Sequence, residues 1–416
     1  MKKNNIIGII AFVGCLSALR ADVITINQIG VGARALSFAN NYVAAANDMS
    51  AIYWNPAALS FMPVREFQIA SDMLTNTSST SFYGTNQESS VRRLRLSDVG
   101  FLTSLPTSRG GLTFGVSLQN PFIFDNNPSF NGSNGNIQDK DTYRGYGSLN
   151  YWSGAFGLQM APGLGVGAAI SLVTGTEKIK HSFLKLTSGY IADGIYDNYD
   201  DTKERDYFGY DIRLGLLYLL PNNLVRIGAR LTLPQTIWFD ETSSFSGDYK
   251  GQLFSSFNGA IGVAGNLPFM TLSTELRFRA PYDYMTPDEA IPSTSPAHQL
   301  KIGAGAGAEI PLFKSNFLFR MGYSWDQYDL YQFAMQYDGE TTGFDQNDQT
   351  SWGTAGYSVV KDRGQVTAGL AYVISNISFE ASYGYQFWKL TASDGINTRY
   401  DNDRLQRVLV SMSLRY

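Results

Sequence analysis

Residues 225–233 read Val-Arg-Ile-Gly-Ala-Arg-Leu-Thr-Leu, an alternating segment that indicates the fold class. Every second residue is apolar, while the residues between them are two arginines, a glycine and a threonine. Because successive side chains of a β-strand point to opposite faces, the pattern predicts a strand with one apolar and one polar face. The same period of two recurs in 112–118, 377–387 and 407–416, with Leu409 as the one exception. One such strand could pack on a soluble core, but a series of them, each near the ~9–11 residues that cross a bilayer, predicts a transmembrane β-barrel.

The strand candidates number about fourteen, and their connections alternate between short and long. The candidates are 66–74, 98–105, 110–119, 147–160, 163–173, 207–220, 224–233, 255–265, 269–279, 298–310, 315–325, 363–374, 376–388 and 405–416. The short turns fall at 106–109, 161–162, 221–223, 266–268, 311–314 and 375–376, and the long polar stretches at 75–97, 120–146, 174–206, 234–254, 280–297, 326–362 and 389–404. Outer-membrane barrels have tight periplasmic turns and long external loops, and an even strand count places both termini in the periplasm. We therefore predict an all-β membrane protein, an antiparallel barrel of the bacterial outer membrane; a soluble β-sandwich would not produce this alternation.

The composition argues against several other classes of protein. Charged residues make up only 16% of the 416 residues and the formal net charge is -4, so the chain lacks the concentrated basic face that nucleic acid requires. Gly (41), Tyr (25) and Phe (26) are abundant, which suits many strands with aromatic girdles. Beyond residue 21 no apolar run is long enough for a membrane-spanning helix, which excludes a helical membrane protein.

Candidate catalytic and metal-binding residues are few. His181, in a long polar stretch, and His298, near a strand end, have no Ser or carboxylate at a spacing that suggests a triad, so we expect neither an enzyme nor a cofactor. Asp197, Asp200 and Asp201, or the Asp-Asn-Asp run at 401–403, could hold calcium. Without a regular ligand spacing, these acidic clusters are better explained as solvated external loops.

The first 21 residues are typical of a signal peptide. Lys2 and Lys3 precede a short apolar stretch at 6–16, and cleavage after Ala18 or Ala21 would place a small residue at the cut. An alternative is a lipoprotein box at 12–15. After either signal-peptidase cut the only cysteine is lost, which leaves no disulfide, thiol nucleophile or zinc-thiolate site.

Several charged residues share the polar face of the strand candidates and are expected to point into the lumen. They are Arg213, Arg226, Arg230, Glu275, Arg277, Arg279, Lys301, Glu309, Arg320 and Glu380. Facing lipid near the midplane, an Arg or Lys would cost on the order of 2–4 kcal/mol. Since both signs occur on neighbouring strands, we expect mutual pairing inside a filled barrel rather than a charged translocation path.

Residues 22–65 do not alternate and are expected to form a helical plug inside the barrel. Residues 30–39 are rich in small side chains at helix-like spacing, which allows close packing. Asn55 followed by Pro56 predicts a helix start, because Asn can cap free backbone N–H groups and Pro lacks the donor that would go unpaired. A separate periplasmic domain is the alternative, but about forty residues without disulfides are marginal for an independent core.

The stretches Gly32-Ala33-Arg34-Ala35-Leu36, Ala44 to Ser50 and above all Asn55-Pro56-Ala57-Ala58-Leu59 resemble the N-terminal hatch of the FadL family of long-chain fatty-acid transporters. The motif match covers only this segment, and the strand count extends the resemblance to the architecture of the rest. The resemblance implies a fourteen-stranded outer-membrane barrel plugged by the hatch, taking up fatty acids or other hydrophobic molecules. It also implies a ligand pocket near the hatch and lateral release where the third strand is kinked.

Individual ligand residues cannot be transferred from the family, so the candidates are the bulky hatch side chains and the Asn-Pro-Ala motif. They are Phe38, Tyr42, Ile52, Tyr53, Trp54, Asn55, Pro56 and Ala57. The candidate lateral opening is Asn120, Pro121 and Phe122, because Pro121 cannot donate to the strand ladder; alternatively, Pro121 only ends the third strand at the outer rim.

Two other functions on a barrel remain open: a binding or anchor protein of a secretion system on the same fold, and a general porin, which a plug disfavours. The expected partners are hydrophobic small molecules, outer-membrane lipid and the barrel-insertion machinery. Tyr416, a terminal aromatic on an alternating strand, resembles the signal read by that machinery. We expect a monomer.

Overall fold

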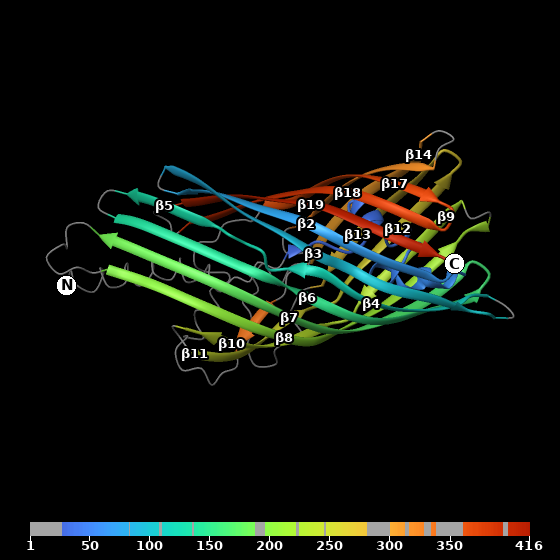
Figure 1. Cartoon of the computed structure of the whole chain (residues 1–416), viewed down its shortest axis with the longest axis horizontal. Helices are drawn as coiled ribbons and strands as arrows, with labels where there is room; N and C mark the ends of the chain where they lie inside the picture. Colours follow the sequence, from blue (N-terminus) through green and yellow to red (C-terminus); the bar gives the residue numbers. More distant parts are fainter. Residues whose placement is uncertain are drawn as a thin grey trace.

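The computed structural model describes residues 27–82, 84–107, 110–134, 137–187, 196–221, 224–244, 247–280, 300–312, 316–327, 334–337, 361–393 and 398–416. Fourteen antiparallel strands form a closed barrel (Figure 1), which confirms the predicted fold class. The barrel strands in order are β2 (Glu66–Phe82), β3 (Thr85–Leu105), β4 (Leu112–Ile123), β6 (Ile137–Ala161), β7 (Leu164–Thr187), β8 (Tyr196–Leu219), β9 (Val225–Thr232), β12 (Asn258–Leu267), β13 (Met270–Arg279), β14 (Lys301–Pro311), β15 (Phe317–Asp326), β17 (Lys361–Ile374), β18 (Ile377–Ser393) and β19 (Thr398–Arg415). Pairing of β19 with β2 closes the ring.

The two ends of the barrel differ. At one end, which we call the turn end, the connections are short, as between Ala161 and Leu164 or Ile374 and Ile377, and the C-terminus lies there (Figure 1). Toward the opposite end, the loop end, β6, β7 and β8 extend to 25, 24 and 24 residues, more than twice what a bilayer requires. Four shorter strands continue the wall there: β5 (Ser129–Asn134), β10 (Gln235–Ser243), β11 (Gly247–Ser255) and β16 (Ala334–Tyr337).

Much of what we predicted as long loops is strand, and those predictions were wrong. Residues 75–82 and 85–97 belong to β2 and β3, and 174–187 and 196–206 to β7 and β8. His181, expected in a loop, is a buried residue of β7, and Asp200, Asp201 and the 401–403 run lie in strands. The physical reason is that the parts of strands beyond the bilayer can be polar on both faces, so they lose the alternation that marks lipid-facing strands. The end of 85–97 nearest the bilayer differs, since Leu94 and Leu96 are exposed there. His298 and residues 1–21, which we predicted as a signal peptide, lie outside the described residues.

The two faces of the barrel wall have opposite chemistry. Large apolar side chains are exposed all round the outside, for example Val116, Ile170, Leu276 and Val410. The inward residues between them are polar or charged, and most of those predicted to face the lumen are buried there, including Arg213, Glu275 and Arg320.

Residues 27–65, which we call the hatch, pack inside the barrel in its turn-end half (Figure 1). The hatch contains β1 (Asn27–Gln28), α2 (Ala33–Ser37), α3 (Ala51–Trp54) and the 3-10 helix η1 (Pro56–Phe61). Nearly all of its side chains are buried, and α2 and η1 contact strands on different sides of the ring. The Asn55 side chain accepts a hydrogen bond from the Ala57 N–H and Pro56 opens η1, so the predicted helix start is confirmed. Among the described residues, no helix has the length and apolar character to cross a bilayer.

Candidate functional site: the hatch, the lumen and the break in the wall

The Asn-Pro-Ala motif is a contact between the hatch and the wall. Asn55 Nδ2 donates to the Val43 carbonyl (2.8 Å) inside the hatch and to the Leu216 carbonyl (3.1 Å) on β8. Two wall glycines allow this approach: a Cβ at Gly167 would lie 2.5 Å from Ala57 N, and one at Gly215 would lie 2.7 Å from the same atom. The motif therefore fixes the hatch against β7 and β8 by backbone proximity as well as by hydrogen bonds.

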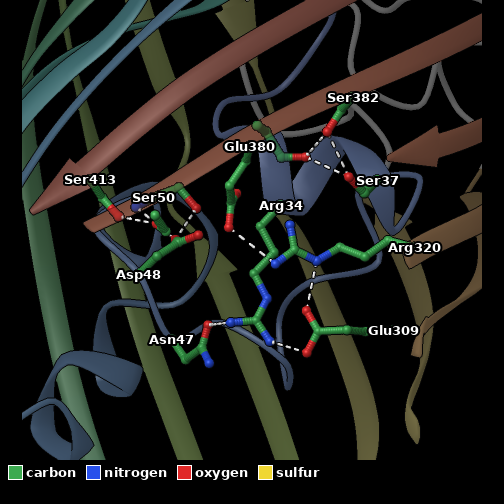
Figure 2. A network of polar contacts seen from close by, with 12 residues as sticks. Arg34, Ser37, Asn47, Asp48, Ser50, Glu309, Arg320, Glu380, Ser382 and Ser413 are labelled. Atoms are coloured by element: carbon green, nitrogen blue, oxygen red, sulfur yellow. Dashed lines mark hydrogen bonds and ion pairs between the residues drawn. The ribbon is translucent and has the colours of Figure 1, made fainter. Parts of the chain in front are cut away.

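A buried ion network fixes the hatch to the opposite part of the wall (Figure 2). Arg34 of α2 binds Glu309 of β14 at 2.9 Å, and Arg320 of β15 binds the same carboxylate at 2.6 Å. Arg320 also reaches Glu380 of β18 at 3.0 Å, and Arg34 donates to Asn47 within the hatch. The predicted pairing of lumen charges is confirmed for this group. Arg277 likewise pairs with Asp326 at 2.9 Å.

Phe38 and Tyr42, two of the predicted ligand residues, also lie in the contact between hatch and wall. The Phe38 ring fills the space over Gly307, where a Cβ would lie 2.6 Å from a ring carbon. The Tyr42 hydroxyl donates to Asp48 at 3.1 Å, and burial, followed by the charge of Asp48, raises the pKa of Tyr42 well above its ordinary value. Tyr42 is therefore a stable hydrogen-bond donor within the hatch.

A small cavity lies where α3, β1 and the wall meet. It is lined by Gln28, Tyr53, Phe122, Asp211, Arg213, Arg230, Thr232, Gln235, Ser255 and Asn258. The Arg213 guanidinium lies 3.7 Å from the centre of the Tyr53 ring and 2.8 Å from an Asp211 carboxylate oxygen. The cavity has room for about one or two water molecules, which is too little for a fatty-acid chain in this conformation.

Toward the loop end, this cavity adjoins a buried apolar cluster, which we call the lumen cluster. Its members are Phe122, Phe124, Leu149, Tyr151, Val173, Tyr207, Ile237, Phe239 and Leu253. Phe124 stacks on Tyr207 with ring centres 5.1 Å apart, and Tyr207 contacts Phe239 at 5.7 Å. Phe122 belongs to the cluster and also lines the cavity, so it connects the apolar lumen to the hatch.

The wall is interrupted at the third strand, β4. In the described part of the chain, the ladder between β3 and β4 runs only from Leu105–Leu112 to Asp98–Gln119. The pairing of β4 with β6 continues, but its register shifts between Gln119 and Phe122. Pro121 therefore does not end the strand. It lies where β4 leaves β3 while staying on β6, as expected for a residue that cannot donate to a ladder.

The start of the hatch occupies the edge that β4 loses. Asn27 and Gln28 of β1 pair with Ile123 and Phe122, and the N–H groups of Ile29 and Gly30 donate to the Pro121 carbonyl at 2.9 and 3.3 Å. Hatch, lumen cluster and wall break are thus joined at one place, the segment 120–124.

Sequence reasoning brought some of these residues together and missed others. Tyr53 and Phe122 line one cavity, whereas Phe38, Tyr42 and Asn55 make contacts between hatch and wall. Ile52, Pro56 and Ala57 also lie against wall glycines, and Trp54 donates to the Val31 carbonyl inside the hatch. Asp211 was missed, although it lies two residues from Arg213 on the same inward face of β8. Apart from Phe122, the residues of the lumen cluster carried no distinctive signal.

Comparison with known proteins bears on this architecture. No family model matches the sequence, and no curated protein matches it. Among solved structures, the fold is similar to a FadL homologue of Pseudomonas aeruginosa (TM-score 0.61, 11% identity, covering 94% of this chain and 99% of that one). It is also similar to the P. putida toluene transporter TodX (TM-score 0.59, 14% identity, 94% and 99% covered) and to the Ralstonia pickettii toluene transporter TbuX (TM-score 0.56, 14% identity, 94% and 99% covered). The chain therefore has the fold of the FadL-like outer-membrane channels.

Proposed function

We propose that this protein takes up hydrophobic molecules across a bacterial outer membrane, receiving them in the lumen and releasing them sideways through the break between β3 and β4. The observation that carries the proposal is the meeting of three features at residues 120–124: an apolar lumen cluster, a fixed hatch and an interrupted wall. Fatty acids and aromatic hydrocarbons are the two substrate classes we consider.

The exposed apolar side chains around the barrel support a membrane location. A soluble protein rarely exposes a continuous apolar surface of more than a few hundred Å². Here, large apolar residues such as Phe114, Ile170 and Leu276 are exposed on strands throughout the ring. Such an apolar surface is stable in contact with lipid, and the charged side chains, which point into the lumen, do not contact the lipid.

The hatch contacts favour a lateral route over an axial one. Displacing the hatch would break the Arg34–Glu309 pair and the Asn55 bonds, and would leave buried charges unpaired, which is strongly unfavourable. Near Pro121, by contrast, the wall already lacks backbone pairing between β3 and β4. A hydrophobic molecule that leaves there enters lipid rather than water.

Binding by the purified protein tests the lumen step. We expect the wild type to bind oleate or toluene, measured by displacement of the apolar fluorophore 1-N-phenylnaphthylamine. Phe124→Asp, which puts a carboxylate into the lumen cluster, should weaken that binding at least about tenfold. The control is Asp240→Asn at an exposed ion pair with Lys250, which should change nothing. A wild type that binds neither probe, and instead co-purifies with a stoichiometric exported protein, would contradict uptake and favour the secretion-anchor function.

We also propose that the turn end, where the C-terminus lies (Figure 1), faces the periplasm. Cysteines placed singly at Gly84, in the turn between β2 and β3, and at Ser375, in a turn-end connection, are both exposed. An impermeant maleimide added to intact cells should label the first and not the second. Equal labelling of both would reject this orientation.

A further inference from the structure

The break between β3 and β4 has defined edges. At one edge, Asn120 Nδ2 donates to the Leu96 carbonyl of β3 at 2.7 Å. At the other, Asn127 Nδ2 donates to the Ser90 carbonyl at 3.3 Å, and the Ser89 hydroxyl donates to the Asn127 carbonyl. Between these two side-chain links, the described β3 has no ladder to β4. We call this interval, 91–95 of β3 facing 121–126, the window.

The Arg93 side chain crosses the window. Arg93 belongs to the inward-facing set of β3, since Arg92 and Leu94 on either side of it are exposed. Its Nε lies 3.2 Å from Oδ1 of Asp125, on the segment that has moved away from β3. Its guanidinium carbon lies 4.3 Å from the centre of the Tyr146 ring on β6. Tyr146 is on the outward face of β6, so Arg93 extends from the inner face of one strand to the outer face of another.

Arg93 is held by contacts that are weaker than those of the hatch. Its side chain is 38% exposed, whereas Arg320 in the hatch network is 1% exposed. A partly exposed ion pair and a cation–π contact each stabilise by modest amounts. Asp125 is itself buried, but when Arg93 leaves, its carboxylate keeps a hydrogen bond from the Gly147 N–H at 3.4 Å, and the freed guanidinium is on the exposed side of the pair. On the outer face of the wall at the window, Leu94 and Leu96 are exposed. On its inner face, Ile123 is buried against Ile29 and Leu74.

We propose that Arg93 is the gate residue of the window: bound to Asp125 and Tyr146 it separates the lumen from lipid, and released from them it opens the path. This inference deepens the proposed function, because it names the residue that controls the lateral exit. Arg93 is a positioning residue for the passage of an apolar molecule, not a ligand for it. Tyr146 contacts the guanidinium on the outer side of the wall and Asp125 binds it on the inner side.

The test reports on opening without any transported molecule. Ile123→Cys, in a Cys15→Ser background, places a thiol behind Arg93, and N-(1-pyrenyl)maleimide dissolved in the bilayer of proteoliposomes can reach it through the window. We expect Arg93→Ala to raise the labelling rate about tenfold, which corresponds to ~1.4 kcal/mol. Arg93→Lys should give a smaller rise, because Lys keeps the charge and loses the planar guanidinium. Tyr146→Leu should also raise the rate, since it removes the ring while staying apolar toward lipid.

The matched control is Arg92→Ala. Arg92 is the neighbouring residue on β3, but its side chain is exposed and contacts Met73 of β2 instead of Asp125 or Tyr146. Its removal takes the same charge from the same strand and should leave labelling unchanged. Heat-modifiable migration on gels shows which variants have a folded barrel.

If the protein with Arg93 and the folded Arg93→Ala variant are labelled at the same rate, Arg93 is not the gate residue. The same conclusion follows if Arg92→Ala raises the labelling rate as much as Arg93→Ala does. These outcomes are separable from failure of the proposed function. If labelling depends on Arg93 and the protein binds no hydrophobic probe, the gate stands and uptake fails. If the protein binds the probes and the labelling rate does not depend on Arg93, the uptake proposal stands and the gate proposal is rejected.

Discussion

The contacts between hatch and wall and the contacts across the window are stabilised in different ways. The hatch is joined to the wall by buried ion pairs such as Arg320–Glu309, and by backbone contact over Gly167. The window is bridged by contacts that each have a partly exposed side chain: Asn120 to the Leu96 carbonyl, and the 38% exposed Arg93 to the buried Asp125. Buried charges are costly to separate and exposed ones are not. The difference indicates that the floor of the lumen is fixed, whereas its side wall can open.

The largest effect should come from the centre of the ion network. Arg320→Ala leaves the buried Glu309 and the partly buried Glu380 without this partner, which should destabilise the hatch by roughly 3–5 kcal/mol. Hydrogen–deuterium exchange of α2 measures it. Lys250→Ala, at an ion pair that is 73% and 74% exposed, is the matched control and should cost ~1 kcal/mol or less. If exchange in α2 is the same in both variants, the hatch is not fixed by this network.

A smaller effect is expected where the hatch meets the wall glycines. Gly167→Ala puts a Cβ 2.5 Å from Ala57 N, and such overpacking should cost about 1–3 kcal/mol. The displaced hatch should raise ion conductance in planar bilayers. Gly154→Ala adds a Cβ with nothing within 4 Å and should conduct like the wild type. A wild type that already conducts freely would favour the porin.

Removing the cap of η1 should have an effect near 1 kcal/mol. Asn55→Ala loses the bond from Ala57 N–H, and hydrogen exchange in η1 should rise without global unfolding. Asn55→Ser keeps a capping oxygen and should recover part of the protection. Loss of heat-modifiable migration in Asn55→Ala would contradict a role confined to the hatch.

The smallest effect belongs to the edge of the window. Asn120→Ala removes an exposed hydrogen bond to the Leu96 carbonyl, and should cost about 0.5 kcal/mol. Exchange should rise in peptides covering the centre of β3 and stay unchanged in the hatch. A rise in hatch peptides of the same size would mean that the two regions are not separately stabilised.

The sequence allowed the strand count and the hatch to be predicted, because both depend on local patterns. Alternation identifies lipid-facing strands such as β9, and Asn55 with Pro56 identifies a helix start. The polar loop-end parts of β2, β3, β7 and β8 were missed because they have no apolar face.

The candidate site was predicted less well. The partner of Arg34 is Glu309, 275 residues away, and a pairing over that distance leaves no local signal. Pro121 could be recognised as a disruption of pairing, but sequence did not decide between a strand end and a wall break. Arg93 could not be recognised at all, since its role depends on where β4 leaves the wall.

Lateral release at the window can be tested by blocking the window from outside. Leu94 in the window is 78% exposed and Leu276, on β13 across the ring, is 67% exposed. Single cysteines at these positions, in a Cys15→Ser background, are coupled to a bulky maleimide, and oleate uptake by whole cells is then measured. We expect the adduct at position 94 to reduce uptake at least about fivefold, which corresponds to ~1 kcal/mol, and the adduct at position 276 to leave it unchanged. Equal uptake with both adducts would contradict lateral release through the window.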